Sequence, residues 1–161
     1  KIYIANETGK KQLLTDEDIS NFKIVDDKLF ATKEGGICCW DLETGNEEGE
    51  CPLNLSDYEV EKSGDGYVIV YCQTEDDGTQ TLWMVKGTGF EWTEPVQIAK
   101  DNAYLRNVSI SVDEEGNIMT ARNLLDVTDD GVQFDKGTLK VDVLDDYADF
   151  VCGDYLVYNS D

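Results

Sequence analysis

Carboxylates are the most abundant side chains in this sequence that could do acid–base or metal chemistry. The 161 residues include 35 Asp and Glu but no His. Histidine is the side chain whose unperturbed pKa lies nearest neutrality, and it supplies the base of most nucleophilic triads. Ser-His-Asp and Cys-His mechanisms are therefore excluded within this chain. Two carboxylates could still hydrolyse a glycoside, but no particular pair stands out among so many acids. The sequence predicts a protein that is not an enzyme.

An aromatic side chain flanked by two carboxylates is the best candidate for a ligand-binding site. Trp92 lies in a turn-like stretch between Glu91 and Glu94. An indole packs against sugar rings or apolar side chains, and carboxylates accept hydrogen bonds. We therefore expect Trp92, Glu91 and Glu94 to contact a carbohydrate or protein ligand. Trp40 and Trp83 lie in apolar runs and are expected to pack in the core.

Clusters of Asp in the expected loops offer oxygen atoms of the kind that bind Ca²⁺. The cluster that we single out holds Asp126, Asp129, Asp130 and Asp135. It lacks the twelve-residue spacing of an EF-hand, and Asp also favours turns because it bonds to nearby backbone amides. A calcium site and solvated turn residues both stay open as interpretations. No other cofactor is predicted.

The five cysteines do not have the spacing of a zinc site, and an odd number cannot pair completely within one chain. Cys38, Cys39, Cys72 and Cys152 lie in apolar, β-branched or aromatic runs, where cysteine usually acts as a small buried hydrophobe. Reduced, buried thiols are expected, with one disulfide as the alternative.

The charge balance is strongly acidic, with a formal net charge of −22. A surface of that sign repels phosphate backbones and anionic lipids, so no nucleic-acid partner is expected. No apolar run approaches the ~20 residues of a membrane-spanning helix, so no membrane insertion is expected either. The acidity indicates solubility, or the recruitment of cations or of a basic partner.

Two families of turn signals alternate along the chain with a period of about 40 residues. Thr-Gly pairs stand at 8–9, 44–45 and 88–89, and acidic or glycine-rich turns stand at 26–27, 64–66, 114–116 and 153–154. Each turn separates two runs of strand-forming residues, which is a hairpin pattern. Apolar runs at 37–40, 68–71 and 82–85 indicate strands buried on both faces. Only residues 15–20 are expected to form a helical turn.

This pattern predicts repeated four-stranded antiparallel meanders, as in the blades of a β-propeller. The units cover residues 20–53, 58–99 and 105–144, the last with an irregular later part. Residues 1–15 match the last two strands of a unit, and 147–161 match the first two. The fold class is all-β: one domain over 1–161, a β-propeller or propeller segment of about four blades. The terminal half-units could pair with each other, or the chain could be a piece of a longer propeller.

Two segments carry a resemblance to known repeat families. Residues 37–46, which contain Trp40-Asp41 and Thr44-Gly45, resemble blades of WD40 and quinoprotein-like propellers. Residues 65–98 are similar to sialidase-like blades, although the Asp-box pattern matches only at Thr74, Asp76 and Gly78. The Gly-His of WD40 blades is absent, and only Arg106 and Arg122 are present where sialidase catalysis uses an arginine cluster. The resemblance implies the scaffold and argues against the enzyme.

These features predict a non-catalytic recognition or scaffold module that binds protein or carbohydrate. A bacterial surface or secreted protein is favoured, and a cytoplasmic location stays open. The alternatives are a carboxylate-based glycosidase or lyase fragment and a purely structural spacer. A buried, protonated carboxylate in a cleft would favour the enzyme, and solvated acids would favour the binding module.

Overall fold

The computed structural model describes residues 2–5, 7–9, 11–76, 78, 80–101, 104–128 and 131–144. All regular elements in these ranges are strands, which confirms the all-β class. The strands are β1 (Ile2–Ala5), β2 (Lys11–Thr15), β3 (Ser20–Val25), β4 (Lys28–Lys33), β5 (Gly36–Asp41), β6 (Glu47–Cys51), β7 (Glu59–Ser63), β8 (Gly66–Thr74), β9 (Gln80–Thr88), β10 (Glu91–Trp92), β11 (Val96–Asp101), β12 (Tyr104–Val112), β13 (Ile118–Thr128) and β14 (Gly131–Leu144).

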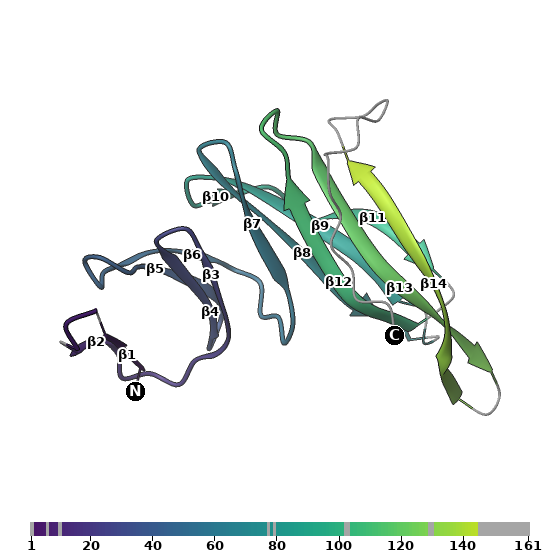
Figure 1. Ribbon diagram of the computed structural model, residues 1–161, viewed down its shortest axis with the longest axis horizontal. Coiled ribbons are helices and arrows are strands. Elements are labelled where there is room, and N and C mark those ends of the chain that lie inside the picture. Colours follow the sequence, from purple (N-terminus) through teal and green to yellow (C-terminus); the bar gives the residue numbers. More distant parts are fainter. Residues whose placement is uncertain are drawn as a thin grey trace.

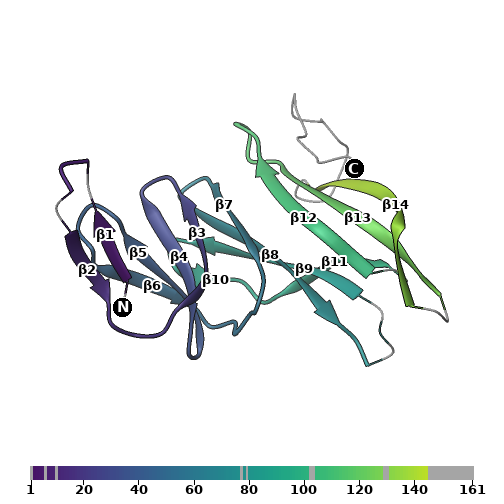
Figure 2. The ribbon, with the colours of Figure 1, turned by 60° about the horizontal axis from the view of Figure 1, so that its bottom comes forward.

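The strands form four antiparallel sheets that follow one another in chain order. The first sheet is β1–β2, and the second is the meander β3–β4–β5–β6. The third is β7–β8–β9, with β10 and β11 both paired to β9, and the fourth is β12–β13–β14. Figures 1 and 2 show these sheets in a row, with β1–β2 at one end and β12–β14 at the other. In the described part of the chain the row stays open.

The predicted turns are present wherever the structure describes them. Gly45, between β5 and β6, has a φ of 75°, and Asp26, between β3 and β4, has a φ of 54°. Glycine and Asp are the residues that enter this left-handed region most readily, which is why short turn signals locate the hairpins. The expected turn at 153–154 lies outside the described residues.

The central strand of the second sheet is buried on both faces, as its apolar sequence predicts. Alternate side chains of a strand point to opposite faces. Ile37 and Cys39 of β5 belong to a cluster shared with the third sheet, which we name the middle seam. Cys38 and Trp40 belong to a cluster shared with β1 and β2, which we name the first seam. The apolar stretch therefore packs two neighbouring sheets at once.

Strand β8 is likewise buried on both faces and packs the third sheet against its two neighbours. Ile69 and Tyr71 pack in the middle seam, whereas Val68 and Val70 pack against β12 and β13 in a third cluster, the last seam. At the centre of the middle seam, the rings of Phe30 and Tyr67 meet edge to face, with centroids 4.7 Å apart. Three apolar seams thus join the four sheets, and burial of apolar surface is the term that stabilises the row.

The first strands of successive sheets lie side by side. Strand β3 contacts β7, and β7 contacts β12. The side-chain amide of Asn21 donates to the Ser56 carbonyl, and Lys23 Nζ lies 2.6 Å from Glu59 Oε1. From the first contact to the second, the residue number rises on both sides, so β3 and β7 run in the same direction. The turns that follow them therefore lie at the same edge of the row, with the turn after β12 (Figure 1).

Two expectations about secondary structure are wrong. Residues 15–20 form no helical turn: the Glu17 N–H donates to Thr15 Oγ1 at 3.2 Å, and β3 begins at Ser20. The later part of the unit 105–144 is regular, because β13 and β14 pair along most of their length. This unit contains three described strands where the repeat predicts four.

The described cysteines are free thiols, and three of the four are buried. Burial raises the pKa of Cys38 to about 11 and the pKa values of Cys39 and Cys51 to about 12. Cys72 is exposed, contrary to expectation, because β8 continues past the apolar seams at its last three residues. Cys152 lies outside the described residues.

Candidate functional site

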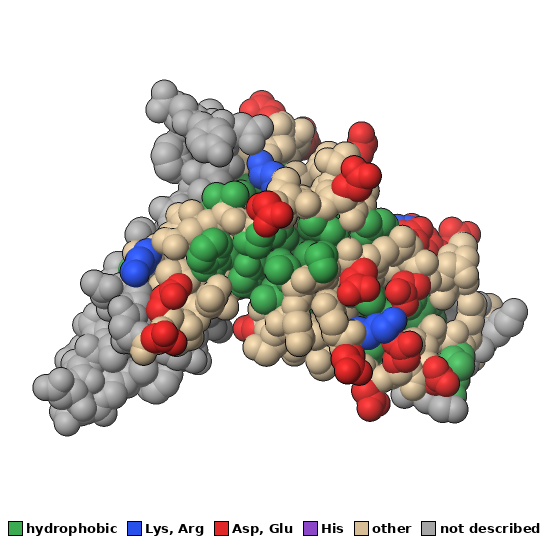
Figure 3. All heavy atoms as spheres, turned by 180° about the vertical axis from the view of Figure 1, so that it is seen from behind, with side chains coloured by type: hydrophobic (Ala, Val, Ile, Leu, Met, Phe, Trp, Pro, Cys, Tyr) green, Lys and Arg blue, Asp and Glu red, His purple; other side chains and the backbone are tan. Residues whose placement is uncertain are grey.

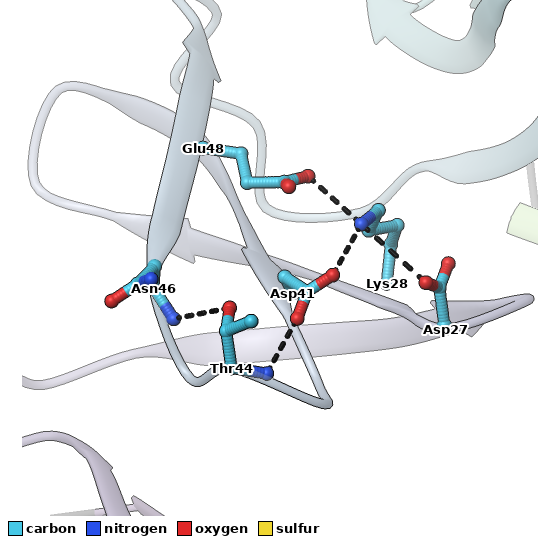
Figure 4. Close-up of polar contacts among 6 residues, drawn as sticks. All are labelled: Asp27, Lys28, Asp41, Thr44, Asn46 and Glu48. Carbon is cyan, nitrogen blue, oxygen red and sulfur yellow. Dashed lines mark hydrogen bonds and ion pairs between the residues drawn. The ribbon is translucent and has the colours of Figure 1, made fainter.

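The turn between β5 and β6 is organised around a buried carboxylate. Asp41 Oδ1 accepts a hydrogen bond from the Thr44 N–H at 2.6 Å, and the Asp41 carbonyl accepts one from Gly45. The Thr44 hydroxyl accepts a further bond from the Asn46 N–H at 3.3 Å (Figure 4). The Asp, Thr and Gly of the propeller-like motif therefore close this turn, so the motif is structural.

Lys28 binds the same carboxylate from the neighbouring strand β4. Its Nζ lies 2.6 Å from Asp41 Oδ2, 3.1 Å from Glu48 Oε2 and 3.5 Å from Asp27 Oδ2 (Figure 4). The hydrogen bond from Lys28, followed by that from the Thr44 amide, holds the pKa of Asp41 well below its usual range. The bond to Asp41 likewise raises the pKa of Lys28. The Lys28–Asp41 ion pair is thus a structural lock between two turns.

This lock gives a pH-dependent contribution to stability. Because the folded-state pKa of Asp41 is lowered, its contribution is complete above the unfolded pKa, about 3.9, and is lost as the pH falls below it. We expect Asp41→Asn to lower the melting temperature by about 4 °C at pH 7. The difference from the wild-type protein should shrink below about pH 4. The exposed turn variant Asp26→Asn is the control, and a pH-independent difference for Asp41→Asn would contradict this interpretation.

Trp92 lies at the rim of the middle seam. Its indole Nε1–H donates to the Glu50 carbonyl of the second sheet at 3.1 Å. The six-membered ring of the indole lies against Gly87: a Cβ added to Gly87 would lie 3.0 Å from carbon atoms of that ring. Trp92 is partly buried against the middle seam. One edge of the indole therefore links the second and third sheets.

The carboxylates predicted to flank Trp92 are both exposed. Glu91 is in β10 beside Trp92, and Glu94 is in the following loop. Within this loop, the Thr93 hydroxyl accepts a hydrogen bond from the Lys86 N–H at 3.1 Å. The structure keeps the predicted residues Glu91, Trp92 and Glu94 on one short segment, with the carboxylates in solvent.

The predicted calcium loop falls largely outside the described structure. Asp129 and Asp130 lie outside the described residues, and only the backbones of Asp126 and Asp135 are described, in β13 and β14. Among the side chains that the structure does describe, no group of three or more metal-binding residues is found.

Asp113, in another acidic turn, uses its carboxylate for the backbone. Its Oδ1 accepts hydrogen bonds from the N–H groups of Glu115 and Asn117, and its Oδ2 accepts one from the Asn117 amide. These bonds, that from the Asn117 side chain most of all, lower the pKa of Asp113. Asp113 thus acts as the expected turn residue, while Glu114 and Glu115 stay exposed.

Exposed acids from three sheets lie along one edge of the row. We define the turn edge as the turns that follow β3, β5, β7 and β12. The β5–β6 turn belongs to it because the Leu42 N–H donates to the Asp27 carbonyl. Its exposed acids are Asp26, Asp27, Glu43, Asp65, Glu114 and Glu115. On the face opposite to Figure 1, Asp and Glu likewise surround a central band of hydrophobic side chains (Figure 3).

Several lysines form ion pairs with carboxylates that the sequence alone does not predict. Lys23 pairs with Glu59, Lys28 with Asp41, and Lys33 with Glu17 at 2.9 Å. Each pair joins residues far apart in the chain, so no local pattern could have predicted it. The charges of these three lysines are used within the fold, and exposed carboxylates dominate the described turns.

In the described ranges, no helix is present that could cross a membrane. No family model matches the sequence, and no curated protein matches it. Among solved structures, the chain is similar to the crystal structure of the N-terminal domain of Nup159, with 14% identity and a TM-score of 0.43. The similarity covers 85% of this chain and 37% of that domain.

Proposed function

We propose that this protein is a non-catalytic, propeller-like recognition module that binds a positively charged segment of a partner protein along the turn edge. The main support for this proposal is that exposed acids gather at the turn edge, while the neighbouring Lys28 already forms an ion pair with Asp41. A cationic segment would meet exposed carboxylates from three successive sheets. Electrostatic complementarity of this kind speeds association and selects the partner.

The packing of the sheets supports a binding role for the turns. Both faces of β5 and β8 are used by the apolar seams, so the strands offer little surface to a ligand. The turns that hold Asp26 and Asp113 are closed by backbone geometry and by carboxylate bonds. Groups that are already ordered lose less entropy when a partner binds.

The chemistry of the described carboxylates supports a non-catalytic role. A carboxylic general acid needs a raised pKa. The pKa values of Asp41 and Asp113 are instead lowered, by hydrogen bonds that hold both groups ionised.

Binding of a lysine-rich peptide, measured by fluorescence anisotropy, tests the proposal. We expect the peptide to bind, and the affinity to fall as salt rises, because exposed charges are screened. The triple variant Asp26→Asn, Asp65→Asn, Glu115→Gln should bind about tenfold more weakly, since each exposed ion pair contributes up to about 1 kcal/mol. Asparagine at position 26 retains the ability to adopt positive φ.

The matched control changes three exposed acids at the opposite ends of the strands. Glu34→Gln, Asp57→Asn and Asp76→Asn raise the net charge by the same amount and leave the turn edge intact. This variant should bind the peptide as the wild-type protein does, apart from the loss of long-range attraction. Equal weakening by both triple variants would show that only net charge matters, and the proposed site would be wrong.

A further inference from the structure

Four of the five large hydrophobic side chains that the described residues expose lie near one end of the row. Tyr3 and Leu13 are 54% and 45% exposed, and Phe22 and Ile24 are 61% and 65% exposed. The fifth, Val96, lies in β11 and is 48% exposed. Isolated exposed apolar residues are ordinary, but two pairs at one end of a stack indicate an uncovered surface.

Phe22 and Ile24 lie on a sheet face that is only partly covered. Ile24 pairs with Leu29 across β3 and β4, and cross-strand partners share a face. Leu29 packs in the first seam under the two strands of the first sheet. The second sheet has four strands, so two strands cover only part of this face. The part along β3, with Phe22 and Ile24, stays open.

The first sheet is placed so that further strands could extend it over β3. The Gln12 amide of β2 donates to the Thr44 carbonyl at 2.9 Å, which puts β2 over the turn between the last two strands of the second sheet. Among the described strands, β1 pairs only with β2, so no described strand pairs with the backbone groups of its other edge. Two more strands beside β1 would complete a four-stranded sheet and cover Phe22 and Ile24.

The sequence pattern at residues 147–161 predicts a hairpin of the missing kind. Phe150-Val-Cys-Gly-Asp-Tyr-Leu-Val-Tyr158 has two apolar runs around Gly-Asp. The hairpin β3–β4 has a similar pattern, Phe22-Lys-Ile-Val-Asp-Asp-Lys-Leu-Phe30, with four residues before the turn where the C-terminal segment has three. Each begins with Phe and places its two-residue turn between short strand-forming runs. Residues 147–161 thus match the first two strands of a unit, and β1–β2 match the last two.

The distance along the row decides which copy supplies this hairpin. Strand β14 ends at Leu144, at the end of the row opposite to β1 (Figure 1). Three sheet-to-sheet steps of about 10 Å separate the fourth sheet from the first, roughly 30 Å in all. The chain from Leu144 to Phe150 spans at most roughly 20 Å. In this open arrangement a hairpin that begins at Phe150 cannot reach β1 of its own chain.

We infer that residues 147–161 of one copy pair with β1 of a second copy, complete its first sheet and cover Phe22 and Ile24. The same docking accounts for the second exposed pair. Tyr3 and Leu13 are cross-strand partners on the outer face of β1–β2. That face would stack on the fourth sheet of the incoming copy, as each sheet of the row stacks on the next. The contact is head-to-tail, so it can form chains or closed rings.

Charge gives this association a salt dependence opposite to that of the proposed peptide binding. Two chains of net charge −22 repel each other, and salt screens that repulsion. Apolar contacts are not weakened by moderate salt. Self-association should therefore strengthen between 50 and 500 mM NaCl, whereas peptide binding should weaken, so either proposal can fail alone.

Sedimentation velocity of the 161-residue chain at several concentrations tests the inference. We expect masses above the 18.0 kDa monomer that increase with concentration and with salt. The variant Phe22→Asp, Ile24→Asp should raise the apparent dissociation constant roughly tenfold or more, because it places charge in an apolar contact. Val96→Asp adds a charge at another exposed apolar position, outside this surface, and should leave the association unchanged.

Complementation separates this contact from simple misfolding. Val151→Asp, Leu156→Asp disables the hairpin that is donated, and Phe22→Asp, Ile24→Asp disables the face that accepts it. Each variant alone should be monomeric, and the two mixed should form a 1:1 complex that grows no further. A wild-type chain that stays monomeric at all concentrations and salts, or variants that assemble as it does, would overturn the inference.

Discussion

Replacing Trp40 with alanine should lower the free energy of unfolding by about 3–5 kcal/mol. Trp40 is 2% exposed and is the largest side chain among the fully buried residues. It packs with Leu14, Leu29 and Cys38 in the first seam, so its removal leaves a cavity between two sheets. The seam cannot readily collapse, because β5 is fixed on its other face by Ile37 and Cys39.

Urea denaturation followed by circular dichroism measures this loss. The control is Val96→Ala, which truncates a half-exposed side chain outside the first seam and should change stability by less than about 1 kcal/mol. Because Trp40 joins β1–β2 to the second sheet, its loss should also raise hydrogen exchange in β1 and β2 more than in β12 and β13. A loss below about 1 kcal/mol for Trp40→Ala would show that the first seam contributes little.

The sequence predicted the features of this fold that are encoded locally. Turn residues such as Asp26 and Gly45 locate hairpins because few other residues tolerate their backbone angles. Unbroken apolar runs predicted the two-sided burial of β5 and β8, because every residue of such a strand must meet an apolar neighbour. These signals span only a few residues, so they survive without knowledge of the tertiary structure.

Contacts between distant segments could not be predicted in the same way. The bond from Trp92 to the Glu50 carbonyl depends on how closely two sheets approach, and the Lys23–Glu59 pair depends on the alignment of β3 with β7. The sequence predicts a ligand contact for Trp92 from its neighbours alone, and the bond to Glu50 is an additional contact that this prediction does not include. The apolar sequence before Cys72 predicts that this side chain is buried. The structure exposes it because β8 extends beyond the apolar seams at its last three residues.

Replacing Gly66 with alanine should lower the free energy of unfolding by about 3 kcal/mol. Gly66 begins β8 and pairs with Thr88 of β9. A Cβ at this position would lie 1.7 Å from the Gly87 carbonyl oxygen and 3.0 Å from the Thr88 Cα. Both atoms belong to the backbone, so no side-chain rotation relieves the overlap. The β8–β9 pairing at this end must open, and the Trp92 ring, which packs on Gly87, must move with it.

Gly64, two residues earlier in the same turn, provides the matched control. An added Cβ there meets no atom within 4 Å, but its φ of 55° is unfavourable for alanine. Gly64→Ala should therefore lose only the backbone term, about 1 kcal/mol. Denaturation monitored by tryptophan fluorescence compares the two variants, and Gly66→Ala should also alter the native emission because Trp92 is displaced. Equal losses for both variants would mean that β8 and β9 do not approach as closely as the structure places them, and the packing of Trp92 at the middle seam would have to be revised.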